Sequence, residues 1–150
     1  MIFVKNVVEG RVKTRLARSV GAEKAVDIYR RLLDYTREVV SPLDCYKLVW
    51  YSRAIEIDDG WTDCEKKRQQ GEGLGERMSY AFRAAFEAGY EKAVIIGSDC
   101  ATIETSLIEK AFEELEDSDI VLGPSRDGGY YLLGMKNYHP QLFEEIDWST

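Results

Sequence analysis

Short apolar runs recur along the chain and predict the strands of a buried sheet. Residues 93–97 read Ala-Val-Ile-Ile-Gly, a run that is short and continuously apolar. Such a run is typical of a central parallel strand that helices cover on both faces. Further strands are expected at 2–5, 46–51, 120–123 and 130–135, and a polar strand near a sheet edge at 65–70.

Apolar positions three and four residues apart predict helices between these strands. The longest helix covers 22–40, and its buried stripe is expected to consist of Val26, Ile28, Tyr29, Leu32, Leu33, Thr36, Val39 and Val40. Ser106 and Glu109 have the spacing of a capping box at the start of a helix that continues to Leu115. The remaining helices are expected at 13–18, 74–89 and 140–146.

Strands and helices alternate along the whole chain, which is typical of an α/β fold with a mostly parallel sheet. We therefore expect a single domain over residues 1–150, with helices on both faces of the sheet in a three-layer α/β/α arrangement. In such sheets, ligands bind beyond the carboxyl ends of the strands. This rule directs attention to the loops at 5–15, 97–102 and 123–130.

The composition excludes several classes of partner. The chain has 150 residues, with 20 Lys and Arg against 27 Asp and Glu, so its formal net charge is −7. We expect no nucleic-acid or membrane partner, because an acidic protein binds polyanions poorly. Three widely spaced cysteines argue against a disulfide framework and a cysteine zinc site. A cytoplasmic protein is expected, and any phosphate ligand would need a local cationic cluster or a metal ion.

One such cluster follows the first strand. Lys5, Arg11, Lys13 and Arg15 lie within one short stretch that also contains Gly10 and leads into a helix. Lysine and arginine side chains, together with backbone N–H groups at a helix start, suit a di- or triphosphate. The glycine spacing of a Walker loop is absent. The alternative interpretation is a solvated basic helix start.

Asp99 follows the central strand almost directly, in the segment Ile96-Gly97-Ser98-Asp99-Cys100. A carboxylate held there would face the ligand crevice, and Mg²⁺ prefers oxygen ligands such as this one together with phosphate oxygens. The alternative is that Asp99 caps the helix that follows.

Two glycine-rich segments remain open to two interpretations each. In Gly123 to Tyr131, the run Asp127-Gly128-Gly129 would let backbone approach a ligand closely, although a type I′ hairpin turn is favoured by the pattern alone. In Gln70 to Met78, Arg77 could meet a phosphate or a carboxylate, or it could be a solvated arginine beside a flexible loop.

Taken in order, these segments resemble a family of small GT-A-like transferases, named as glycosyltransferases or as radical-SAM/selenodomain-associated transferases. The resemblance covers the whole chain. The chain is also similar to 2-phospholactate guanylyltransferase and to molybdenum-cofactor nucleotidyltransferases. The matching segments are Phe3 to Asn6, Gly10 to Leu16, Leu74 to Met78, Ile96 to Cys100, Leu122 to Gly134, and Trp148-Ser149-Thr150.

The resemblance implies a nucleotide-diphospho-sugar transferase fold and a set of roles. It implies a metal-dependent transferase that acts on a nucleotide sugar or a nucleoside triphosphate and a small-molecule acceptor. Lys13 and Asp99 would be catalytic, and Asp99 would hold Mg²⁺ or Mn²⁺. Nucleotide phosphates would be bound by Lys5, Gly10, Lys13, Thr14 and Arg15, and the acceptor by Arg77, Asp127, Gly128 and Gly129.

The chain departs from the family pattern at several points. Val7 and Ala101 stand where the family often has proline, and Gly73 where it commonly has aspartate. The chain is expected to lack the family's C-terminal segment, since Trp148-Ser149-Thr150 would begin a further helix. A shortened sheet would expose an edge and favour a homodimer. Glycosyl transfer from a nucleotide sugar is the expected reaction. Nucleotidyl transfer to a phosphorylated small molecule and a non-catalytic nucleotide-binding module stay open as alternatives.

Overall fold

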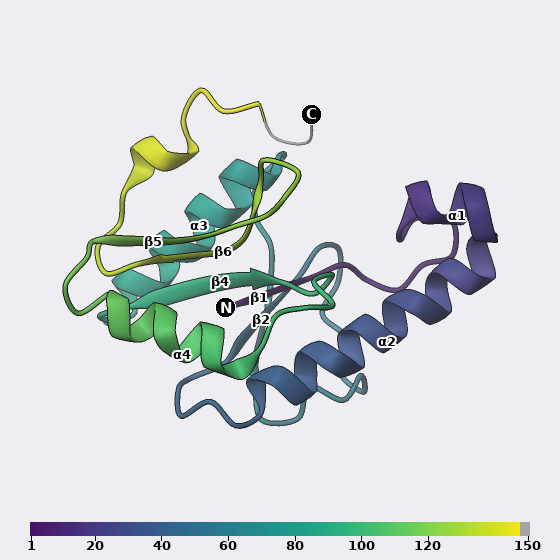
Figure 1. Ribbon diagram of the computed structural model, residues 1–150, viewed down its shortest axis with the longest axis horizontal. Helices are drawn as coiled ribbons and strands as arrows, with labels where there is room; N and C mark the ends of the chain where they lie inside the picture. Colours follow the sequence, from purple (N-terminus) through teal and green to yellow (C-terminus); the bar gives the residue numbers. More distant parts are fainter. Residues whose placement is uncertain (148–150) are drawn as a thin grey trace.

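The computed structural model describes residues 1–147 and contains one six-stranded sheet in the order β3-β2-β1-β4-β6-β5 (Figure 1). β1 to β4 run parallel, and β6 is antiparallel to both of its neighbours, so five of the six strands share one direction. This confirms the mostly parallel α/β sheet. The strands are β1 (Ile2–Val4), β2 (Leu48–Tyr51), β3 (Glu65–Arg68), β4 (Ala93–Gly97), β5 (Ile120–Pro124) and β6 (Tyr130–Met135).

Helices cover both faces of this sheet and give three layers (Figure 1). α2 and α4 pack on one face, and α3 and the 3₁₀ helix η1 pack on the other. α1 packs against α2, and none of its own residues is buried. The bounds are α1 (Thr14–Val20), α2 (Ala22–Val40), α3 (Leu74–Glu87), α4 (Thr105–Glu114) and η1 (Pro140–Phe143). None of these helices, within residues 1–147, is long and apolar enough to cross a membrane.

The central strands are buried because alternate side chains enter two different cores. In β4, Val94 and Ile96 pack on the α2 and α4 side, whereas Ala93 and Ile95 pack on the α3 side. This arrangement explains the continuous apolar run in the sequence. β3 is polar and forms an edge of the sheet, as predicted.

Three details of the predicted helices are wrong. Ile28 is 37% exposed, because it lies beside the buried stripe of α2 and not within it. The capping box does not form, since α4 starts at Thr105 and its N-cap, Glu104, makes no side-chain capping bond. The Thr105 hydroxyl instead donates to the Val39 carbonyl at 2.6 Å and ties α4 to α2. The helix expected at 140–146 is only the single turn η1.

The glycine-rich segment 123–131 is a β-hairpin, as the pattern favoured, but its turn is not of type I′. Ser125 N–H donates to the Gly129 carbonyl at 2.9 Å, and Gly128 N–H donates to the Ser125 carbonyl at 3.3 Å. Type I′ requires two consecutive residues with positive φ. Within this turn only Gly128 has one, at 89°. The short connection also explains why β6 is antiparallel to β5.

A cluster of charged and polar groups holds the irregular loop between β2 and β3. Lys66 Nζ donates to the Asp59 carboxylate at 2.7 Å and to the carbonyls of Glu56 and Ile57. The hydroxyl of Tyr51 also donates to Asp59. Burial alone would raise the pKa of Asp59, but the hydrogen bonds from Lys66 and Tyr51 outweigh it and lower this pKa.

The pH dependence of stability in Asp59→Asn tests whether the Asp59 carboxylate stabilises this cluster. A carboxylate with a lowered pKa stabilises the fold above its unfolded pKa of about 3.9, and this stabilisation is lost as pH falls through the folded pKa. At pH 7 we expect urea unfolding to show a loss of about 1–2 kcal/mol in Asp59→Asn. The difference in free energy of unfolding between Asp59→Asn and wild type should become smaller towards pH 3. The exposed neighbour Asp58 supplies the control, Asp58→Asn. If the stability difference between Asp59→Asn and wild type stayed constant between pH 7 and pH 3, the lowered pKa of Asp59 would be contradicted.

Candidate active site

The carboxyl edge of the sheet brings together residues that are far apart in the sequence. β1 and β4 are parallel neighbours, so the loops that follow them leave the sheet at the same edge. Lys13 Nζ lies 3.4 Å from Asp99 Oδ2, although the two residues are 86 positions apart. The two strongest sequence candidates thus meet as predicted from the strand rule. The β5–β6 hairpin and the start of α3 lie at this edge too (Figure 1).

Asp99 is exposed at the end of β4 and does not cap a helix. The N-cap of α4 is Glu104, so the capping alternative is wrong. A Cβ at Gly97 would lie 3.0 Å from Asp99 Oδ1, so glycine leaves room for this carboxylate. Ser98, between them, is 4% exposed and fixes the backbone just before Asp99.

The buried hydroxyl of Tyr29 joins the two loops from beneath. It accepts a hydrogen bond from the Lys5 N–H at 2.8 Å and lies 2.9 Å from Ser98 Oγ. Burial raises the pKa of Tyr29, so the hydroxyl stays protonated at neutral pH. The sequence placed Tyr29 in the apolar stripe of its helix, and no local signal marks its hydroxyl as part of the site.

Lys13 has an unusual backbone. It is the N-cap of α1 with φ 47° and ψ 47°, the left-handed region that side chains other than glycine rarely adopt. Val12, the preceding residue, is 2% exposed and anchors the chain in the core. Strained backbones of this kind gather at functional positions.

The other predicted phosphate ligands lie on the exposed loop that precedes Lys13 and on the first turn of α1. Lys5, Thr14 and Arg15 are solvent-exposed. Gly10 adopts a φ of 76°, within a turn closed by a hydrogen bond from the Arg11 N–H to the Val8 carbonyl at 3.0 Å. Within residues 1–147, the ion pairs and side-chain hydrogen bonds involve neither the Lys5 ammonium group nor the Arg15 guanidinium, and both side chains are exposed, so both are available to an anion.

Asn6 is a further residue of this edge that sequence reasoning missed. Its amide donates to the Ala54 carbonyl at 2.7 Å and to Glu56 at 2.8 Å, and its oxygen accepts from the Arg53 N–H at 2.9 Å. Asn6 therefore fixes the loop after β2 against the loop after β1. Its position two residues after the end of β1, within the matching segment Phe3 to Asn6, is the signal that could have identified it.

Arg77 supports a loop at the start of α3. Its guanidinium donates to the Gly71 carbonyl at 2.9 Å and to Gln69 Oε1 at 3.4 Å. Gln69, which the sequence analysis did not single out, is buried and donates in turn to the Trp50 carbonyl at 2.9 Å. The guanidinium of Arg77 is thus hydrogen-bonded to the loop that precedes α3. It is not the solvated arginine of the alternative interpretation.

The hairpin carries Asp127 at its tip, where the carboxylate serves the turn itself. The Ser125 hydroxyl and the Gly129 N–H both donate to it, the latter at 3.2 Å. These hydrogen bonds, with that from Ser125 the stronger, lower the pKa of Asp127. The backbone of Gly128 and Gly129 is exposed beside it.

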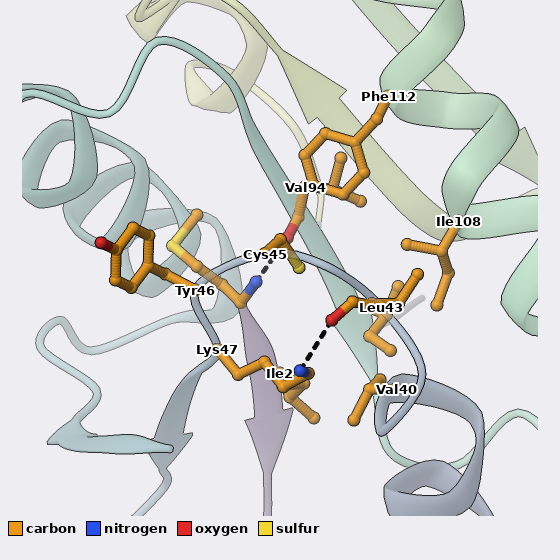
Figure 2. A pocket seen from close by; sticks show the side chains of 11 residues that line it. Ile2, Val40, Leu43, Cys45, Tyr46, Lys47, Val94, Ile108 and Phe112 are labelled. Carbon is orange, nitrogen blue, oxygen red and sulfur yellow. Dashed lines mark hydrogen bonds between the residues drawn. The ribbon is translucent and has the colours of Figure 1, made fainter. Parts of the chain in front are cut away.

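Two hollows lie at the opposite, amino edge of the sheet. Figure 2 shows one of about 30 Å³, lined by residues such as Ile2, Cys45, Val94 and Phe112. A neighbouring, more open hollow of about 540 Å³ extends past Tyr90. Neither of these two hollows includes Lys13 or Asp99.

Within residues 1–147, no three His, Cys, Asp or Glu side chains are grouped to hold a metal ion. Among residues 1–147, Asp99 is the carboxylate that forms an ion pair with Lys13. One carboxylate is still compatible with Mg²⁺, which commonly takes its remaining ligands from substrate phosphates and water. The donor set therefore fits a cation that arrives with a phosphate ligand, and not a preformed metal centre.

Comparison with known proteins places the chain in a family. Residues 43–150 match the family model DUF2064, described as an uncharacterized protein conserved in bacteria. The chain belongs to the DUF2064 family.

Relatives of this DUF2064 chain are named as guanylyltransferases. It is 30% identical over 130 residues to 2-phospho-L-lactate guanylyltransferase of Methanocaldococcus jannaschii, and 27% identical over 129 residues to the enzyme of that name from Methanocaldococcus sp. FS406-22. These alignments cover 84% of the chain but only 55% and 54% of the relatives, so the chain spans just over half of their length.

A crystal structure from Desulfovibrio desulfuricans has the same fold. It is described as a "putative nucleotide-diphospho-sugar transferase" and superposes with a TM-score of 0.91 at 34% identity. The match covers 99% of this chain and 68% of the other. The fold implied by the sequence resemblance is therefore confirmed. Trp148-Ser149-Thr150, the last matching segment of that resemblance, lie outside the described residues.

Two substitutions of Lys13 test whether its backbone is strained. Lys13→Gly and Lys13→Ala remove the same ion pair, but only glycine adopts a left-handed φ without steric conflict. We expect Lys13→Gly to be more stable than Lys13→Ala by about 1 kcal/mol. Urea unfolding measures this difference, and equal stabilities would show that the backbone at this position is not strained.

Tyr29→Phe tests the link between the two loops. It removes the partner of the Lys5 N–H and of Ser98, and should lower the free energy of unfolding by about 1–2 kcal/mol. Hydrogen exchange of the Lys5 amide should become faster. Tyr46, which is 81% exposed, provides the control Tyr46→Phe, for which unchanged stability is expected. Unaltered exchange at Lys5 in Tyr29→Phe would argue against the link.

Proposed function

We propose that the chain is a metal-dependent transferase that uses a nucleotide-activated donor. The carrying observation is the contact between Lys13 and Asp99 at the carboxyl edge of the sheet, 3.4 Å apart. A cation and a carboxylate in this position suit the phosphates of a nucleotide and its divalent metal ion. The names of the guanylyltransferase and nucleotide-diphospho-sugar transferase relatives support this proposal.

The donor phosphates are bound by the loop after β1. Lys13 and Arg15 neutralise the charge on the donor, with Lys5 on the same loop beside them. This local concentration of cations matters because the chain as a whole carries a net charge of −7. Gly10 lets the donor approach the backbone of this loop, and Thr14, the first residue of α1, is exposed beside Lys13.

Asp99 is the residue that would hold a divalent cation, Mg²⁺ or Mn²⁺. When bound, such a cation neutralises charge that develops on the leaving phosphate. The protein's part is to hold the backbone that carries this carboxylate, which the hydrogen bond between Ser98 and Tyr29 does at 2.9 Å. The acceptor lies towards the hairpin, where Asp127, Gly128 and Gly129 present exposed backbone, and towards Arg77.

Nucleotidyl transfer is the reaction that we favour. An oxygen of the acceptor phosphate attacks the α-phosphorus of a nucleoside triphosphate, and pyrophosphate leaves as the bond between the α-phosphorus and its bridging oxygen breaks. A phosphate oxygen is already anionic, so no general base is needed. This suits the site, because Asp99 is paired with Lys13 and Asp127 accepts hydrogen bonds within its own turn. The two guanylyltransferase relatives named above also favour it.

Glycosyl transfer from a nucleotide sugar is the second candidate, favoured by the description of the similar crystal structure. There an acceptor hydroxyl attacks the sugar carbon, and a nucleoside diphosphate leaves. The hydroxyl must lose its proton, so this reaction requires a base in addition to the residues named above.

Thermal unfolding with a panel of nucleoside triphosphates and nucleotide sugars, each with and without Mn²⁺, tests the proposal. A donor at about 100 times its Kd should stabilise the protein by about 2.7 kcal/mol. We expect a Mn²⁺-dependent shift with a nucleoside triphosphate that Asp99→Asn abolishes. Glu114→Gln, a change in an exposed ion pair on α4, is the matched control and should keep the shift.

Product analysis then separates the two reactions. Pyrophosphate release marks nucleotidyl transfer, and nucleoside diphosphate release from a nucleotide sugar marks glycosyl transfer. Asp99→Asn should slow the reaction by at least about 100-fold. Donor binding without turnover would instead support the non-catalytic nucleotide-binding alternative, and absence of any donor-induced shift would contradict the proposed function.

A further inference from the structure

Lys13 and Asp99 have different ligands in the proposed function, yet they contact each other in the structure, with Nζ 3.4 Å from Oδ2. We propose that this ion pair is exchanged on donor binding. Lys13 leaves Asp99 for a phosphate oxygen of the donor, and Asp99 thereby becomes available to a divalent cation. The inference rests on the proposed function and adds to it a coupling between phosphate and cation binding.

The ion pair can open without disturbing its surroundings. The side chains of Lys13 and Asp99 are 27% and 66% exposed, so water solvates both when they separate. Ion pairs this exposed contribute little stability. Their separation also exceeds the distance of about 2.7–2.9 Å that is typical of a tight charge-assisted hydrogen bond.

The two backbones stay in place while the side chains exchange partners. Lys13 follows the buried Val12 and is the N-cap of α1. Asp99 follows Ser98, whose hydroxyl contacts the buried Tyr29 hydroxyl at 2.9 Å. Rotation of the two side chains is therefore sufficient, and no segment of the fold has to move.

Lys13 and a divalent cation compete for the same carboxylate. A cation bound to Asp99 would lie within a few ångströms of the Lys13 ammonium group if that group stayed, and like charges at that distance repel strongly. A donor phosphate removes this conflict because it accepts the ammonium group. Binding of phosphate must then favour binding of the cation, and by thermodynamic reciprocity the cation favours the phosphate by the same factor.

Binding of Mn²⁺ alone to the whole chain, followed by the electron paramagnetic resonance of free Mn²⁺, tests the exchange without turnover. With no phosphate present, we expect Lys13→Met to bind Mn²⁺ at least about 5-fold more tightly than wild type, the lower end of common coupling factors. A merely structural role for Lys13 would not increase affinity for a cation. A non-hydrolysable nucleoside triphosphate in the presence of EDTA should, in contrast, bind Lys13→Met more weakly than wild type.

Two variants control for the loss of one positive charge. Arg15→Met removes a cation from the same exposed region but leaves the ion pair with Asp99 intact. Lys110→Met removes a lysine from an exposed ion pair on α4, with Glu114. Both should change the Mn²⁺ affinity much less than Lys13→Met does. An equal gain in Arg15→Met would show that the general electrostatic field, and not the ion pair, limits Mn²⁺ binding, and would overturn the proposal.

The other outcomes separate this inference from the proposed function. Suppose that wild type binds Mn²⁺ with the nucleotide and that Asp99→Asn does not. If a folded Lys13→Met then binds Mn²⁺ alone no more tightly than wild type does, the exchange is overturned and the proposed function stands. If Asp99→Asn and wild type bind Mn²⁺ equally in the presence of the nucleotide, the proposed function fails, and the exchange fails with it.

Discussion

The hydroxyl of Tyr29 ties the ends of β1 and β4 together, and the geometry of the carboxyl edge depends on this link. It accepts the Lys5 N–H at 2.8 Å and contacts Ser98 Oγ at 2.9 Å, in a buried place that water does not readily reach. Both loops of the candidate site begin at these two residues. Because their starting points are held in place, side chains as distant in sequence as Lys13 and Asp99 lie within a few ångströms of each other.

The local structure at this edge departs from ordinary preferences where the proposed chemistry needs it. Lys13 adopts a left-handed backbone, and Asp99 stands exposed at a strand end without capping the next helix. The core of the chain follows the usual rules, with buried apolar strands and amphipathic helices. Outside the candidate site, Glu145 also has a positive φ, of 54°. Conflicts between local preference and the fold are expected to gather at functional positions.

Positive charge is also concentrated at the carboxyl edge of the sheet. The chain is acidic overall, yet Lys5, Lys13 and Arg15 gather beyond one end of the sheet. The described hollows lie at the other end, near Cys45 and Tyr90. The candidate site is therefore defined by the chemistry of its loops and by charge, and a polyanionic donor would complete it by supplying oxygen ligands to a metal ion that Asp99 alone cannot fully coordinate.

The sequence by itself determined the α/β class, the buried β4 strand and the cationic loop beside Asp99, because hydrophobic periodicity and strand-end position are local properties. Only the tertiary structure decided that β6 enters between β4 and β5, that Asp127 serves its own turn, and that Arg77 holds the Gly71 carbonyl. It also revealed the roles of Tyr29, Asn6 and Gln69. Each of these depends on a partner distant in sequence or on the exact path of a loop, and neither is encoded in a short stretch of residues.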